Sequence, residues 1–71
     1  PNPSNEQLNL YVDGTTILSY QIIDYMGRNV KSKNINNQTL VKIDISSLAQ
    51  GAYLIKAETK LGKVEKKIIV K

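Results

Sequence analysis

The fold is decided by residues 43–71, which read IDISSLAQGAYLIKAETKLGKVEKKIIVK. Within this stretch, residues 52–59 and 64–70 are rich in aliphatic side chains, and the turn Lys60-Leu61-Gly62-Lys63 joins them. Apolar side chains recur at every second position in both runs, which predicts two strands joined as a hairpin. The stretch contains no His and no Cys, so it is better suited to recognition by a partner than to catalysis.

The last of these strands has an interrupted apolar face. Val64, Ile68 and Val70 share one side of the strand with Lys66. A charged residue among inward-facing positions is typical of a strand at the edge of a sheet. We therefore expect the final strand to lie at an edge.

Further strands are expected upstream. Residues 7–12 and 39–46 alternate apolar and polar side chains, and the second run is the clearest period-two signal in the chain. Residues 15–25 form a longer β-prone run, in which the adjacent pair Ile22-Ile23 suggests cover on both faces. Residues 28–35 are mostly polar and are expected at a sheet edge.

Turn signals separate these strands. Asp24-Tyr25-Met26-Gly27-Arg28 is the clearest, because Asp in the first position and Gly in the fourth fit a type I turn closed by a left-handed glycine. Asn36-Asn37 predicts another turn. Ser46 to Gly51 predicts a corner with one 3₁₀ turn, where Leu48 enters the core and Gly51 takes a backbone angle that a side chain disfavours. About six strands without a convincing helix predict an antiparallel β-sandwich.

The whole chain, residues 1–71, is expected to be a single small domain. A domain of this size buries only about 60% of the surface of its unfolded chain. Disulfides and the usual zinc ligands are excluded because Cys and His are absent, so a small apolar core must hold the fold. No apolar run approaches the roughly 20 residues that span a bilayer. The opening Pro1-Asn2-Pro3-Ser4 has no starting Met, and we expect a linker here, cut from within a longer protein.

The net charge of +4 resides in one part of the chain. Residues 56–71 hold six lysines and two glutamates, whereas residues 1–55 hold four basic and four acidic side chains. A nucleic-acid surface would use such a basic stretch. Lysines also protect an exposed edge strand from pairing with other chains, and this second explanation is favoured. We therefore expect no nucleic-acid partner.

The sequence leaves little room for catalysis. Without His or Cys, the Ser-His-Asp and Cys-His arrangements and the common transition-metal sites are excluded. Of the six acidic residues, Asp13 and Asp24 read as turn positions and Asp44 as the outward side of a strand, and a small sandwich offers little of the dry pocket that a catalytic pair needs. Asn37-Gln38-Thr39 matches a glycosylation sequon but also suits a turn entering a strand. We expect no enzyme activity, no cofactor and no metal.

Four segments in order resemble a known family. They are the opening Pro1-Asn2-Pro3, the hairpin from Ile22 to Val30, the corner from Ile43 to Tyr53 with its Gly-x-Tyr sequence, and the terminal strand from Gly62 to Lys71. Together they resemble the type A C-terminal sorting domain of the type IX secretion system of Bacteroidota. The resemblance covers essentially the whole chain. No single motif is specific, and it is their order and position that make the match strong.

The resemblance implies an immunoglobulin-like β-sandwich, usually of seven strands, with one strand expected to be short or hidden within residues 15–25. It implies a domain at the end of a secreted cargo, which directs that cargo from the periplasm through the outer membrane. The implied partners are the translocon and its shuttle components, a sortase-like signal peptidase that removes the domain, and the N-terminal cargo domain. The cargo then remains on the cell surface or is released. The family's motifs carry over to Gly27, Gly51, Tyr53, Lys66, Lys67 and Lys71 as the residues of the sorting signal.

Other interpretations stay open. An adhesion or carbohydrate-binding module of immunoglobulin or fibronectin type would share the fold and differ only in its surface. Of the four tyrosines, Tyr11 and Tyr25 are expected to be exposed, and they do not suggest an aromatic binding strip. A structural spacer would change neither export nor activity when removed. A weak homodimer through edge strands is a further expectation.

Overall fold

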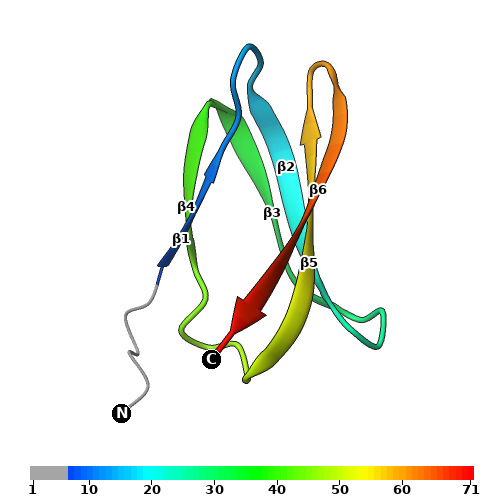
Figure 1. The fold of residues 1–71 in the computed structure, drawn as a ribbon. Helices are drawn as coiled ribbons and strands as arrows, with labels where there is room; N and C mark the ends of the chain where they lie inside the picture. The colour runs from blue at the N-terminus through cyan, green and yellow to red at the C-terminus, as the bar shows by residue number, and fades with distance from the viewer. Residues whose placement is uncertain (1–6) are drawn as a thin grey trace.

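The computed structural model describes residues 7–71, which form six β-strands and no helix (Figure 1). All of the paired strands run antiparallel. The predicted all-β sandwich is therefore confirmed, with six strands in the described part of the chain. No membrane-spanning helix is found within residues 7–71. The strands are β1 (Gln7–Tyr11), β2 (Ile17–Asp24), β3 (Asn29–Gln38), β4 (Leu40–Asp44), β5 (Gly51–Thr59) and β6 (Gly62–Val70).

The strands divide into two sheets of unequal width. β1 and β4 form a two-stranded sheet, and the other four strands follow the order β3-β2-β5-β6. In Figure 1 the narrow sheet lies on the left and faces the wide one. Among the described residues β2 and β5 each have two neighbours, whereas β1, β3, β4 and β6 each keep one unpaired edge. The edge positions predicted for the return strand after Gly27 and for the final strand are confirmed.

The core lies between the two sheets and follows the predicted alternation. Ile22 of β2 lies directly across from Ile55 of β5, and Ile43 of β4 joins them from the narrow sheet; each is at most 1% exposed. Burying one such side chain fully is worth about 1.5–3 kcal/mol. Leu48 packs against this core from the corner, as predicted. The other buried apolar residues are Leu10, Ile17, Tyr20, Val41, Ile45, Tyr53, Ala57, Ile68 and Val70.

The predicted turn at Asn36-Asn37 is wrong. β3 continues through both residues, and the chain changes sheets only between Gln38 and Leu40. The register with β2 jumps from Asn34 to Gln38, so this segment bulges out of the ladder. Asn37 has a φ of 51°, a left-handed conformation that Asn tolerates better than most residues. The asparagines thus bend the strand toward the other sheet and do not reverse it.

The corner predicted between Ser46 and Gly51 begins with a single turn of the 3₁₀ type, as expected. The Leu48 N–H donates to the Ile45 carbonyl at 3.1 Å, which closes a single turn. The chain then passes directly into β5.

The expected cover on both faces of β2 is found on one face only. Ile22 is buried, but Ile23 lies half-buried on the outer face, opposite Leu54 of β5. Residues 15–25 hold the single strand β2, so they contain no hidden seventh strand. The linker predicted at Pro1-Asn2-Pro3 lies outside the described residues.

Candidate recognition surfaces

The β2–β3 hairpin is held together by the carboxylate of Asp24. One carboxylate oxygen accepts the backbone N–H groups of Met26 and Arg28 at 3.0 and 2.9 Å, and the other accepts Nε of Arg28 at 2.8 Å. The backbone N–H of Arg28, supported by its guanidinium and by Met26, holds the pKa of Asp24 below its usual value. Gly27 donates to the Asp24 carbonyl at 2.9 Å and has a φ of 86°, as the turn signal predicted.

The corner before β5 is held by Tyr53. Its hydroxyl donates to the Ala49 carbonyl at 2.6 Å, and the residue is only 8% exposed. Gly51 begins the strand with a φ of 154°, a conformation that favours glycine. Because its side chain is buried, Tyr53 shapes the corner and does not present its ring to a partner.

Most of the predicted sorting residues come together at one end of the wide sheet. Asp24, Tyr53 and Ile68 are direct neighbours across β2, β5 and β6, so the Gly27 hairpin, the Gly51 corner and the end of β6 share that end. Lys71 follows directly after β6. The spacing of the sequence motifs could not show this convergence, because it depends on the order of the strands.

An apolar patch lies on the outer face of the same end. Leu54 lies opposite Lys67, and Ala52 lies opposite Ile69, which is 59% exposed. Tyr25, 82% exposed, lines a shallow hollow with Leu54 and Lys67. Lys67 is therefore a cation surrounded by apolar side chains. Such a combination of a charge with apolar groups is suited to recognition by a partner.

The lysines of the last hairpin do not form one uniform basic stripe. On the outer face, Lys56 lies directly opposite Glu65, and Lys63 directly opposite Glu58. Opposite charges in directly facing positions attract weakly across a sheet. The predicted role of lysines as edge guards thus accounts for only part of their distribution.

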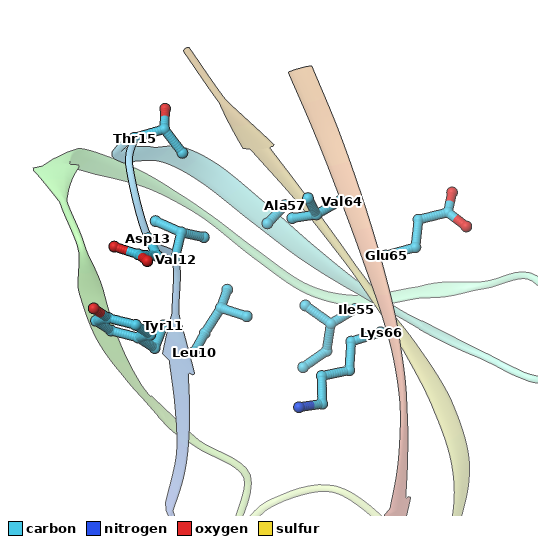
Figure 2. Close-up of a pocket in the computed structure, with 10 residues that line it drawn as sticks. All are labelled: Leu10, Tyr11, Val12, Asp13, Thr15, Ile55, Ala57, Val64, Glu65 and Lys66. Atoms are coloured by element: carbon cyan, nitrogen blue, oxygen red, sulfur yellow. The ribbon is translucent and has the colours of Figure 1, made fainter. Parts of the chain in front are cut away.

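Lys66 lies on the inner face, in a groove between β1 and β6. Figure 2 shows its side chain extending toward β1, while Leu10 points toward Ile55 from the other side. The groove has a volume of about 290 Å³ and is lined mainly by apolar side chains, including Val64. Val64 occupies an inward position yet is 46% exposed, because the narrow sheet does not extend over it. The sequence predicted that Lys66 interrupts the apolar face, but not that a groove opens beside it.

A metal site and an aromatic stacking platform are two other classes of site. No cluster of three or more acidic side chains that could hold a metal ion occurs in residues 7–71. Tyr11 and Tyr25 are exposed as predicted, but Tyr11 ends β1 and Tyr25 lies in the hairpin at the opposite end of the sandwich (Figure 1). Two tyrosines so far apart do not make one stacking platform.

A family model described as the secretion system C-terminal sorting domain matches residues 1–71, the whole chain. The chain belongs to this family. It is a C-terminal sorting domain of the type IX secretion system, as its motifs indicated. No curated protein and no solved structure matches the chain.

Membership in the sorting-domain family states the general role of the chain. It is a secretion signal recognised by the type IX system, whose products reach the cell surface or the exterior. The family implies an origin in Bacteroidota. The hairpin, the corner and the terminal strand described above are the structural forms of the motifs that carried the resemblance.

Proposed function

We propose that this sorting domain directs a cargo from the periplasm across the outer membrane and is then removed by a sortase-like peptidase. The observation that carries the proposal is the family match over all 71 residues. The cargo is an N-terminal domain of the same protein, and this domain follows it as a single unit. The cargo then stays on the cell surface or is released.

The domain acts by being bound and has no catalytic role. The carboxylates of Asp24 and Asp44 are both engaged in hydrogen bonds within turns, so they are occupied structurally. The groove is open and mainly apolar, and the two carboxylates that line it, those of Asp13 and Glu65, point away from each other in Figure 2. A translocon or shuttle component would instead read the surface of the domain.

The sorting residues divide into two groups by what they can do. Lys66, Lys67 and Lys71 are exposed cations at the end of the chain, available to acidic groups of a translocon or shuttle component. Gly27, Gly51 and Tyr53 set the backbone of the hairpin and corner that flank them. The first group would make contacts, and the second would keep those contacts in place.

An export assay tests this proposal. The 71 residues are fused after a fluorescent reporter that carries a periplasmic targeting signal, in a bacterium that has the type IX pathway. We expect reporter in the medium or on the surface, with the domain removed, and periplasmic retention in a strain lacking the translocon. Retention in the competent strain would contradict the proposal.

A matched pair of triple variants tests the lysines. Replacing Lys66, Lys67 and Lys71 by Ala should retain the reporter in the periplasm, because the contacting cations are lost. Replacing Lys56, Lys60 and Lys63 by Ala removes the same charge from the same hairpin and should leave export near normal. Equal retention by both variants would show that only net charge matters.

A further inference from the structure

We propose that the free edge of β1 binds an extended segment of a partner protein, which adds to the narrow sheet as a third strand and places a carboxylate on Lys66. The inference rests on the proposed export function and names a docking surface for it. This docking mode differs from binding at the lysine-bearing end of β6, because the backbone contacts with the partner would be made by β1.

The four unpaired edges of the sandwich are not equally protected. β6 carries Lys63, Glu65, Lys66 and Lys67, and the edges of β3 and β4 also carry charged side chains. Charged residues on an edge discourage pairing with another strand. β1 reads Gln-Leu-Asn-Leu-Tyr and has no charged residue and no proline. Among the edges in residues 7–71, β1 alone has no such protection.

The backbone of β1 has hydrogen-bonding groups directed to that edge. The Val12 N–H donates to the Thr39 carbonyl at 2.9 Å, on the β4 side. In an antiparallel ladder, alternate residues direct both their N–H and C=O groups to the same side. The backbone N–H and C=O groups of residues 8 and 10 are therefore directed to β4. Those of Asn9 and Tyr11 are directed to the free edge. A partner strand can pair with them without disturbing β4.

The added strand would lie where the sandwich lacks cover. The wide sheet has four strands and the narrow sheet two, and the inward side chains in the first half of β6, those of Val64 and Lys66, stay exposed. A third strand beside β1 would lie over the groove and bury Val64, since facing sheets pack about 10 Å apart. The groove in Figure 2 is thus the space left by a missing neighbour of β1.

The chemistry of the groove identifies the segment. Leu10, Ile55 and Val64 call for aliphatic side chains at alternate positions of the partner strand. Once the groove is covered, the ammonium of Lys66 loses water and needs an opposite charge. The segment therefore carries an Asp or Glu between its aliphatic residues. The open groove of 290 Å³ is near the lower limit of about 300 Å³ for small-molecule pockets, which favours a few side chains of a strand.

A second copy of this chain fits the groove less well. Pairing two β1 edges would bring Gln7–Tyr11 of one copy against the other, and this strand has no carboxylate to meet Lys66. Pairing through β6 would bring its lysine-rich edges together. The charge in the groove thus points to a different protein.

A proline at the free edge tests the inference in the reporter assay. Asn9→Pro removes an edge N–H and obstructs an added strand while sparing the β1–β4 hydrogen bonds. We expect the exported fraction to fall about tenfold, as a loss of about 1.4 kcal/mol of binding would give. The control is Lys42→Pro, which places the same residue on the free edge of β4. Thermal unfolding of both variants shows that each still folds.

A charge reversal provides the second arm. Lys66→Glu should retain the reporter, whereas Lys66→Arg should export it, because a carboxylate on the partner needs a cation at this position. Lys60→Glu makes the same charge change in the β5–β6 turn and should export normally.

The outcomes separate this inference from the proposed function. Failure of the unmodified domain to export its reporter overturns the proposed function itself. Normal export with Asn9→Pro, or an equal loss with Lys42→Pro, overturns the β1 docking surface and leaves the proposed function standing. Sedimentation equilibrium tests the other occupant: a dimer of the chain that Asn9→Pro dissociates would assign the edge to a second copy and overturn the inference.

Discussion

The two long flanks of the sandwich are built differently. On the flank formed by β3 and β4, the chain itself crosses from one sheet to the other between Gln38 and Leu40, and Nζ of Lys31 donates to the Asp44 carbonyl at 2.9 Å. On the flank formed by β1 and β6, no part of residues 7–71 crosses between the sheets, and the inward Val64 is 46% exposed. The closed flank is suited to holding the two sheets together. The open flank is suited to binding a partner.

The largest expected effect comes from truncating one side chain to Ala in the core and one on the open flank. Ile22→Ala deletes a fully buried side chain and should cost about 2–5 kcal/mol, which for a chain this small is a large share of its stability. Val64→Ala should cost about 0.5 kcal/mol, as surface changes do. Urea unfolding followed by circular dichroism measures both. Similar costs would mean that the groove is closed in solution.

The next test removes one hydrogen bond from the corner. Tyr53→Phe keeps the buried ring and deletes only the hydroxyl that donates to Ala49. We expect a loss of about 0.5–1.5 kcal/mol in the free energy of unfolding. Tyr25→Phe is the control, because Tyr25 is 82% exposed and should change stability very little. An unchanged stability for Tyr53→Phe would remove the structural role assigned to that hydroxyl.

A smaller effect of opposite sign is expected on the open flank. Lys66→Leu completes the apolar face of β6 and should raise the free energy of unfolding by about 0.5 kcal/mol. The same change deletes the cation of the proposed docking surface, so export should fall while stability rises. A variant that is both more stable and fully exported would separate Lys66 from recognition.

The effect that is smallest at neutral pH concerns Asp24. Its folded pKa is lowered, so the stability from its ionised hydrogen bonds is present above the unfolded pKa of about 3.9 and is lost as pH falls through the folded value. Asn keeps one acceptor oxygen, so Asp24→Asn should change stability little at pH 7 and reduce its decline in acid. A thermal unfolding series from pH 7 to pH 2 measures this. An acid limb as steep as that of the unmodified chain would contradict the role of the carboxylate.

The sequence predicted the local elements better than their assembly. Alternation placed Ile43, Ile55 and Val70 on inward faces, and Asp24 with Gly27 located the first hairpin, because each of these depends on neighbours along the chain. The bulge at Asn37 was missed because a left-handed Asn serves a turn and a bent strand equally well. The groove was missed because it depends on how many strands each sheet receives.

The recognition residues show the same division. Lys66 could be singled out from the sequence by its place among inward apolar positions. That it lies in a groove beside β1 could not, because this depends on β1 having β4 as its one neighbour among the described strands. The convergence of Gly27, Gly51 and β6 at one end likewise follows from antiparallel pairing across β2, β5 and β6. Conversely, β1 carried a visible clue, since its lack of charge can be read directly from Gln7–Tyr11.

The attachment of β1 to β4 alone also has a mechanical consequence. Gln7 is paired with Asp44 at the start of the β1–β4 ladder, and Figure 1 shows that β1 begins, and β6 finishes, toward the same end of the molecule. A pull applied to Gln7 and Lys71 would therefore open that ladder like a zipper, one residue pair after another. The end of β6 is loaded in the same way, but its ladder with β5 holds nine residue pairs against five between β1 and β4, so we expect the narrow sheet to come apart first.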